Sequence, residues 1–226
     1  MNLGQMETVL MRYGFDQNDP LAAWINGAMH DVEAAYDWPW CWEGPIQLQV
    51  PGGPTTGLGG STIPLPSDFQ KVHSVKDLDH LAKIKFWNRH KFTRLIQDET
   101  DTGLIEIYTL IGTNQIQFWR VPVVQTNIML IYQAATPDLV NATDIPTTAG
   151  NTWPLQLHYP IIMRAASIAL QAENEEDRAK TAQDEFDRAL MRCMAKFAED
   201  QLDEPMTVED AQGYAADMPL RGIAGW

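Results

Sequence analysis

The segment DPLAAWINGAMHDVEAAYDWPWCWE, residues 19–43, carries the strongest structural signal in the chain. Its apolar residues recur at spacings of three and four, which places them on one face of a helix. They are Trp24, Ile25, Ala28, Val32 and Ala35. Asp19 is suited to cap this helix and Pro20 to occupy its first turn. Asp37 and Pro39 end it, because a residue that precedes proline is displaced from the α region.

Half of the eight tryptophans lie in this segment, at Trp24, Trp38, Trp40 and Trp42. Aromatic surface of that size needs a large partner surface for its burial. The only other long apolar helical face lies more than a hundred residues later, near the C-terminal end. We therefore predict that the two ends of the chain pack as one helical body. Its expected core residues are Trp24, Ile25, Val32, Trp38, Trp40, Phe186 and Phe197.

Three further helices are expected in this body. Residues 1–15 form a short amphipathic helix that ends at Gly14. A helix over 154–172 should turn Leu155, Tyr159, Ile162, Ala165 or Ala166, and Ala169 inward. Asn174 is expected to cap a last helix over 174–201, about 42 Å long at 1.5 Å per residue. That length suggests an outer wall or a contact between subunits.

The hydrophobic period changes to two after Gly44, which is typical of half-buried strands. Ile46, Leu48 and Val50 alternate with glutamines, and Gly112-Thr-Asn114 is a hairpin signal between two apolar runs. Residues 70–94 show no clear period. The glycine-rich stretch PGGPTTGLGGST, residues 51–62, is predicted to be a loop. The segment 44–137 is thus interpreted as an inserted antiparallel β-sandwich or small barrel.

These patterns give an α+β protein in four parts. The helical body comprises residues 1–43 and 152–202, and it flanks the inserted β domain, residues 44–137. A connecting loop covers 138–151. Residues 203–226 lack a sustained period and form an extended C-terminal tail that is expected to become ordered on a partner.

Composition excludes several classes of protein. The net charge of −14 keeps the chain soluble and repels nucleic acid at long range. No apolar window is long enough to cross a bilayer, and the first residues do not resemble a signal peptide. Cys41 and Cys193 are expected to be buried thiols in a reducing compartment, with a disulfide between them as the alternative if the two halves touch there.

No motif for catalysis, metal binding or a cofactor emerges from the sequence. The five histidines lack zinc-finger and HExxH spacing, the glycine-rich loop lacks a P-loop ending, and there is no GxSxG. Asp98, Glu99 and Asp101 are interpreted as a solvated turn rather than a cation site. The expectation is a protein that is not an enzyme and has no cofactor.

One run of residues is both basic and aromatic. Its cations, interleaved with Phe86, Trp87 and Phe92, are Lys83, Lys85, Arg89, Lys91 and Arg94. Against a net charge of −14, such a run is a candidate contact for DNA or for an acidic partner. The alternative is a salt-bridged strand and loop, because a short charge run is most often a solvated face.

Short motifs in this order of elements resemble a known family. Trp24-Ile-Asn-x-Ala28 and Trp38-Pro-Trp40 are followed by Leu65-Pro-x-Asp-Phe69 and, before the late helices, by WPLQLHYP at residues 153–160. Over residues 1–200 the chain is similar to the head-to-tail adaptors, or connectors, of tailed bacteriophages. The chain differs from the family pattern in Ile63-Pro64 and in its long glycine-rich loop.

The resemblance implies a homo-oligomeric ring, usually a dodecamer, that docks on the portal in the neck of the virion after assembly in the host cytoplasm. Such a ring extends the DNA channel, through which packaged double-stranded DNA passes without specific binding, retains the genome, and supports a tail or nozzle protein. By analogy, the C-terminal tail would dock on the portal through Met218, Leu220, Ile223 and Trp226. The glycine-rich loop would contact the tail or a neighbouring subunit through Gly52, Gly53, Thr55, Thr56 and Leu58.

Two other functions remain open at this point. The first is a different neck or tail-completion protein, such as a tail terminator. The second is a glycan-binding or glycan-cleaving module that uses exposed tryptophans and a pair of carboxylates. Membrane association is not expected in any of these cases.

Overall fold

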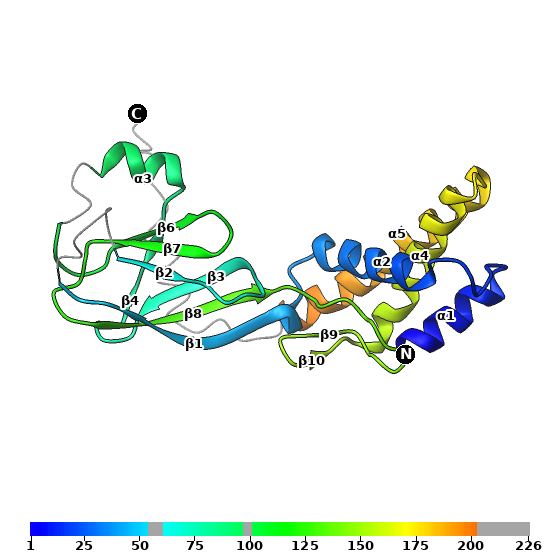
Figure 1. Cartoon of the computed structure of the whole chain (residues 1–226), viewed down its shortest axis with the longest axis horizontal. Coiled ribbons are helices and arrows are strands. Elements are labelled where there is room, and N and C mark those ends of the chain that lie inside the picture. Colours follow the sequence, from blue (N-terminus) through cyan, green and yellow to red (C-terminus); the bar gives the residue numbers. More distant parts are fainter. Residues whose placement is uncertain (54–60, 97–100, 203–226) are drawn as a thin grey trace, which may run out of the picture.

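The computed structural model describes residues 1–53, 61–96 and 101–202. Figure 1 shows an elongated molecule with helices gathered at one end and strands at the other. The chain begins in the helices, crosses into the strands and returns to the helices. This order confirms the expected α+β class, with N- and C-terminal helices that flank antiparallel sheets.

The elements are labelled in Figure 1. The helical end comprises α1 (Leu3–Arg12), α2 (Leu21–Ala35), η1 (Pro39–Cys41), η2 (Leu155–Leu157), α4 (His158–Ala172) and α5 (Glu176–Leu202). The other end comprises β1 (Trp42–Val50), β2 (Ser61–Pro64), β3 (Phe69–Asp77), β4 (Ala82–Lys83), β5 (Lys85–Phe86), α3 (Arg89–Leu95), β6 (Ile107–Ile111), β7 (Gln115–Trp119) and β8 (Thr126–Ala134). A small hairpin between them comprises β9 (Thr147–Thr148) and β10 (Asn151–Thr152), within and beside the expected connecting loop.

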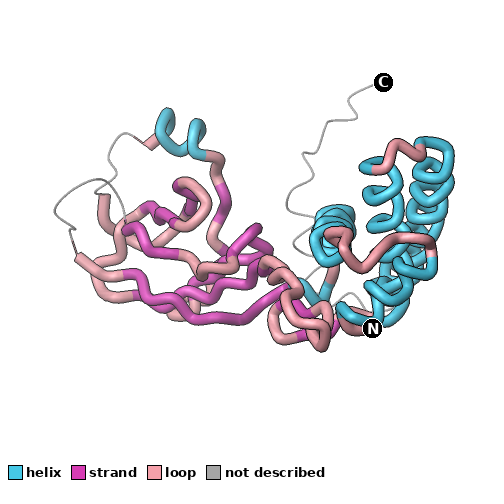
Figure 2. The backbone as a smooth tube through the Cα atoms, turned by 45° about the vertical axis from the view of Figure 1, so that its right-hand side comes forward, coloured by secondary structure: helices cyan, strands magenta, loops and turns pink. Residues whose placement is uncertain are grey.

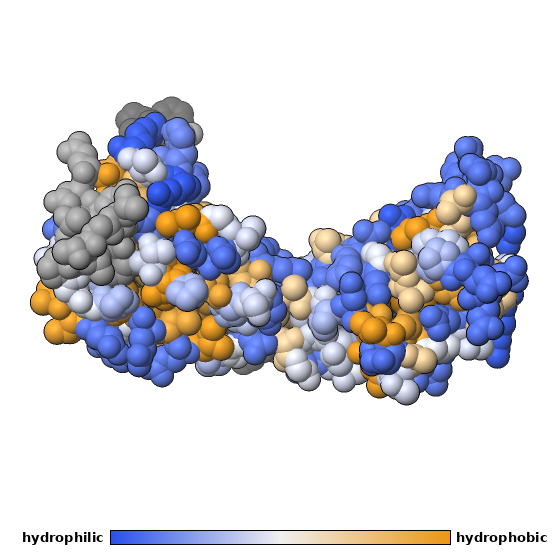
Figure 3. All heavy atoms as spheres, viewed as in Figure 1, coloured by the Kyte–Doolittle hydropathy of each residue, from blue (hydrophilic) through white to orange (hydrophobic). Residues whose placement is uncertain are grey.

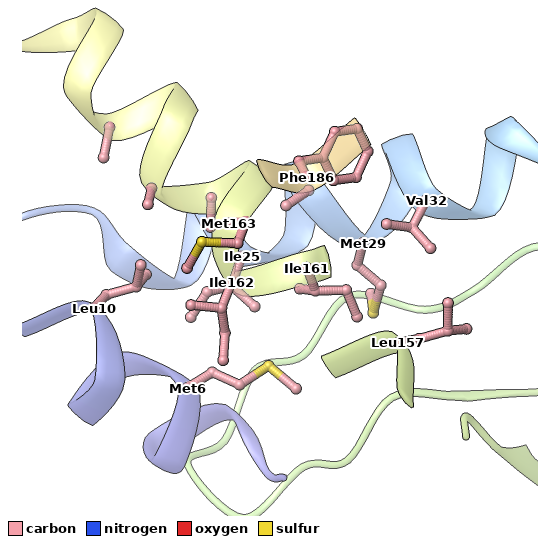
Figure 4. Packing of buried hydrophobic residues seen from close by; sticks show 14 of the residues in the cluster. Met6, Leu10, Ile25, Met29, Val32, Leu157, Ile161, Ile162, Met163 and Phe186 are labelled. Atoms are coloured by element: carbon pink, nitrogen blue, oxygen red, sulfur yellow. The ribbon is translucent and has the colours of Figure 1, made fainter. Parts of the chain in front are cut away.

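One hydrophobic core joins the two ends of the chain. Buried residues of α1, α2, α4 and α5 form a single cluster, part of which is seen from close by in Figure 4. Trp38 lies in it at 0% exposure, and its ring meets that of Phe197 at 5.9 Å between centroids. Trp24, Trp40 and Phe197 are partly buried against the same cluster. The early tryptophan-rich segment and the last helix therefore share one interior.

The starts of two helices differ from expectation. Pro20, not Asp19, occupies the cap position of α2, and no side chain caps it. The Asp19 carboxylate instead accepts a hydrogen bond from the backbone N–H of Asp16. Asn174 does not cap α5, because it ends α4 in the left-handed conformation with φ +62°. Asparagine serves in that position because its short polar side chain tolerates positive φ.

The inward face of α4 is as expected at Ile162, Ala165, Ala166 and Ala169, which are buried, but its beginning differs. Leu155 and Tyr159 were expected to point inward, but they are 75% and 49% exposed. Leu157 and Ile161 are buried in this stretch instead. The 3₁₀ turn η2 precedes α4 and has a tighter period than an α-helix, so extrapolating the α-helical spacing back to Leu155 gives the wrong face.

The strands form two four-stranded sheets, in the orders β1-β8-β3-β4 and β2-β7-β6-β5. A second hydrophobic cluster takes buried residues from both sheets, including Leu130 of β8 and Phe118 of β7, so the sheets pack face to face as a sandwich. All named pairs within the two sheets are antiparallel except β5 with β6. The Gly112 turn joins β6 to β7, as its sequence predicted.

The short helix α3 covers the outer face of the second sheet. Tyr108 of β6 points into the sandwich, and its neighbour Ile107 points the opposite way. Ile107 packs there against Phe92 of α3 and against Ile96, the residue that follows the helix. Figure 2 shows this helix apart from the helices at the other end of the molecule. It was not predicted from the sequence, because seven residues give too little periodicity.

Polar side chains of α2 hold the strand that returns from the sandwich. The Asn26 amide donates to the Leu139 carbonyl at 3.1 Å and accepts from the Leu139 N–H at 2.9 Å. The buried Glu33 carboxylate accepts from both the N–H and the hydroxyl of Thr136, at 3.0 and 2.8 Å. Hydrogen bonds to a charged acceptor are stronger than neutral ones, so this seam fixes where the β8 strand meets the helices.

Candidate assembly surfaces

Large aliphatic side chains are exposed where β3 ends and β8 begins. These strands are in register there, with Asp77 opposite Ile128, and this end of the sandwich lies farthest from the helices in Figure 1. The exposed residues, called here the aliphatic tip, are Leu78, Leu81, Leu104, Val123 and Val124. Figure 3 shows apolar atoms on the same end of the molecule. Solvent-exposed apolar groups that gather in this way mark an interaction site.

Leu81 is the most unusual residue of the aliphatic tip. It is 89% exposed, and its φ of +54° lies in the left-handed region. A leucine there costs about 1–2 kcal/mol relative to the right-handed conformation, which glycine or asparagine would largely avoid. Leu81 ends the turn that joins β3 to β4, which sets this φ, but its side chain buries almost nothing within the chain. A large exposed leucine at such a position is a candidate for a contact outside the chain.

The aliphatic tip borders the root of the glycine-rich loop. Three residues of the aliphatic tip, Leu104, Val123 and Val124, line part of a pocket of about 250 Å³. Gly53 donates to the Pro122 carbonyl at 2.9 Å. A Cβ on Gly52 would lie 2.3 Å from the Val124 carbonyl carbon, so only glycine allows the two segments to approach this closely. The root of the loop and the aliphatic tip are therefore one surface.

A second apolar surface lies on the helical end, between α1 and α4. This groove has a volume of about 440 Å³. Its lining comprises Met1, Val9, Tyr13, Leu155, His158, Tyr159, Ile162 and Met163. The hydroxyl of Tyr159 donates to Glu185 at 2.8 Å, which fixes the ring at the rim. Figure 3 shows apolar atoms on the helical end beside the N-terminus. The molecule thus presents an apolar surface at each end.

The predicted basic run lies on a third surface. All five of its cations are exposed, and they extend from β4 through β5 to α3. Lys91 lies 4.3 Å from the centroid of the Trp87 ring, and Arg89 donates to the side-chain oxygen of Gln117. In the part of the chain that the structure describes, none of the five makes an ion pair with a carboxylate. The salt-bridged strand weighed as the alternative is not what the described residues form.

The family model for the SU10 adaptor protein matches residues 1–209. The chain belongs to this family. A search of curated proteins found no match. The family confirms the resemblance to phage adaptors that the short motifs between residues 24 and 160 indicated, and it makes the chain a phage structural adaptor protein.

The adaptor shows no metal site in its described ranges, where no three potential ligand residues of the His, Cys, Asp or Glu types come together. Cys41 and Cys193 are both buried free thiols. Burial, aided by the charge of Glu33, raises the pKa of Cys41 to about 12, and burial raises the pKa of Cys193 as well. Both are therefore protonated at neutral pH, and a protonated thiol is a poor nucleophile.

The structure describes only part of the contacts expected for the adaptor. Gly52 and Gly53 are among the described residues, whereas Thr55, Thr56 and Leu58 lie outside them, as do Met218, Leu220, Ile223 and Trp226. No described helix is long and apolar enough to span a bilayer. The aliphatic tip was not found from the sequence, because its residues come from three separate turns. The positive φ of Leu81 likewise has no sequence signal.

Proposed function

We propose that the adaptor is a structural part of the phage neck, where copies of the chain form a ring, usually a dodecamer in proteins of this kind, beneath the portal. The ring extends the DNA channel, retains the packaged genome and carries a tail or nozzle protein, without catalysis. It assembles in the host cytoplasm. The observation that supports this proposal most is the family match over residues 1–209, because it names an adaptor. The two apolar surfaces add to it, since a subunit of such a ring needs contacts both with neighbouring copies and with the proteins that the ring joins.

In this proposal the two ends of the molecule have different partners. The helical end and the tail that follows α5 face the portal, and residues 203–226 dock on it. The aliphatic tip and the glycine-rich loop face the tail protein. The groove between α1 and α4 lies on the helical end and is assigned to a neighbouring copy in the ring. Support for this assignment is the apolar lining of the groove, which a ring contact would remove from water.

Removal of residues 203–226 is expected to abolish binding to the portal while the fold is kept. The hydrophobic core uses residues up to Phe197, so the truncated chain retains every buried residue of both main clusters. Mass measurement of mixtures with purified portal gives the readout, and circular dichroism of the truncated chain is the control. Undiminished binding by the truncated chain would contradict the docking assignment. Rings that form on tail tubes alone, without the portal, would favour a tail-completion protein instead.

The substitution Leu81→Asp is expected to weaken binding of the tail protein at least about tenfold, because it places a charge in an apolar contact. Aspartate tolerates positive φ better than leucine, so the fold should not suffer. Val140→Asp is the matched control, since Val140 is 78% exposed and lies outside both apolar surfaces. Titration of assembled portal–adaptor complexes with the tail protein measures the effect. Equal weakening by both substitutions would argue against a tail contact at the aliphatic tip.

A further inference from the structure

Charge is distributed unevenly between the two parts of the adaptor. Residues 44–137 contain eight Lys or Arg and seven Asp or Glu, a net charge of +1. The total net charge is −14, so the remaining residues together carry a net charge of −15. Five of the eight cations fall between residues 83 and 94, and no acidic residue lies between 80 and 97. These five are called here the basic patch.

The sandwich holds the basic patch in a defined position. Phe92 is fully buried and Ile96 nearly so, and both anchor α3 on Ile107 of β6. Ile84 is buried between Lys83 and Lys85, which directs both lysines outward. The basic patch is thus a built surface on strands and a packed helix, not a run of charges on a loose loop.

Among the described residues, the carboxylates nearest to the basic patch in sequence do not cancel it. Asp101 and Glu106, the described acids nearest to it in sequence on the β6 side, each pair with Arg120 at 3.1 Å. The acidic helical body lies at the other end of the elongated molecule. At physiological salt, charges are screened beyond about 8 Å. The net charge of −14 consequently does not determine what the basic patch meets at short range.

We infer that the basic patch binds the phosphate backbone of double-stranded DNA, without sequence preference. Five exposed Lys and Arg side chains within twelve residues, held on strands and a packed helix, are the electrostatic footprint of such binding. The role given to this contact rests on the proposed function, in which DNA passes every copy of the ring. The contact would hold the DNA loosely and reversibly, since it uses no base edges.

The main competitor for the basic patch is an acidic surface on a second copy of the chain. If copies stand side by side in a ring, the sandwich of one faces the sandwich of the next. Every described carboxylate within residues 44–137 already has a partner in its own chain. The pairs are Asp68 with Tyr132, Asp77 with His80, Asp79 with Asn127, and Asp101 and Glu106 with Arg120. In the described part of a neighbouring sandwich, each carboxylate is therefore already engaged, and DNA fits the patch better.

The test compares two triple variants that change the net charge equally, from −14 to −17. One carries Lys83→Gln, Lys85→Gln and Lys91→Gln in the basic patch. The matched control carries Lys180→Gln, Arg188→Gln and Lys196→Gln, which are exposed cations of α5. Fluorescence anisotropy of a short labelled duplex, titrated over a range of salt concentrations, measures DNA binding. Sedimentation of the same proteins measures self-association.

For the full chain we expect log K to fall with log salt at a slope of about −4.5, from roughly 0.9 per phosphate contact and five contacts. The patch variant should bind at least about tenfold more weakly, with a slope near −2, and the control should stay close to the full chain. Equal loss in both variants, or no binding of the duplex by the full chain, would overturn the inference. So would a patch variant with altered self-association and unaltered DNA binding, because that result would place an acidic protein surface on the patch. The DNA-binding assay contains no portal protein, so a negative result in it would not contradict the proposed function. Likewise, a failure to bind the portal would not contradict the inference that the basic patch binds DNA.

Discussion

Replacement of Trp38 by alanine should lower the free energy of unfolding by about 3–5 kcal/mol, the usual cost of removing a fully buried large aromatic side chain. Trp38 is 0% exposed and stacks on Trp40 at 4.9 Å between ring centroids. Its Nε1–H donates to the Val32 carbonyl at 2.7 Å. Alanine would leave a cavity and an unpaired carbonyl beside α2, where the two ends of the chain meet. Urea denaturation followed by circular dichroism measures the change.

Trp42→Ala is the control for this prediction. Trp42 is half-buried, and its ring stacks on His73 at 4.0 Å on the sandwich side of the turn. It does not belong to the cluster that joins the two ends of the chain. Its loss should therefore cost less than half as much as the loss of Trp38. Equal costs for the two substitutions would show that Trp38 is not the centre of the shared core.

The helical body could be predicted because its signal is long and repeated. Apolar spacing in α2 and α5 extends over several turns, so errors of one residue at the ends do not change which face is buried. The same argument explains two failures. At Leu155 a 3₁₀ turn alters the period just before α4, and at α3 the helix has only seven residues. Local geometry of this kind is set by packing on other segments, which one stretch of sequence does not show.

The assembly surfaces were less predictable than the fold. Buried residues recur along an element with a regular period, which the sequence shows. An exposed surface made of several turns depends on which turns the topology brings together, which the sequence does not show. Leu81 and Val124 are more than forty residues apart, and neither belongs to a sequence motif. The basic patch was found because all five cations lie within twelve residues. Only the structure showed that these five cations make no ion pair among the described residues.

The stability of the adaptor should depend on pH through His158, which is 3% exposed at the start of α4. Burial, and then the charge of the N-terminal amine, lowers its pKa to about 4. The unfolded value is about 6.5, so between these values the unfolded chain binds a proton that the folded chain does not. Stability therefore rises with pH across this window and is lost as pH falls. The full difference corresponds to about 3 kcal/mol, of which about 2 kcal/mol should be lost between pH 7 and pH 5.

His30 provides the opposite sign within the same protein. Burial opposes its charged form, but hydrogen bonds and charges from Asp138 and Glu33 outweigh burial and raise its pKa. Its contribution is present below the unfolded value and is lost as pH rises through the folded value. Urea denaturation at pH 7 and pH 5, at constant ionic strength, separates the two histidines. His158→Asn should remove most of the loss at pH 5, whereas His30→Gln should keep or enlarge it. A loss of unchanged size in His158→Asn would assign the pH dependence to groups other than His158.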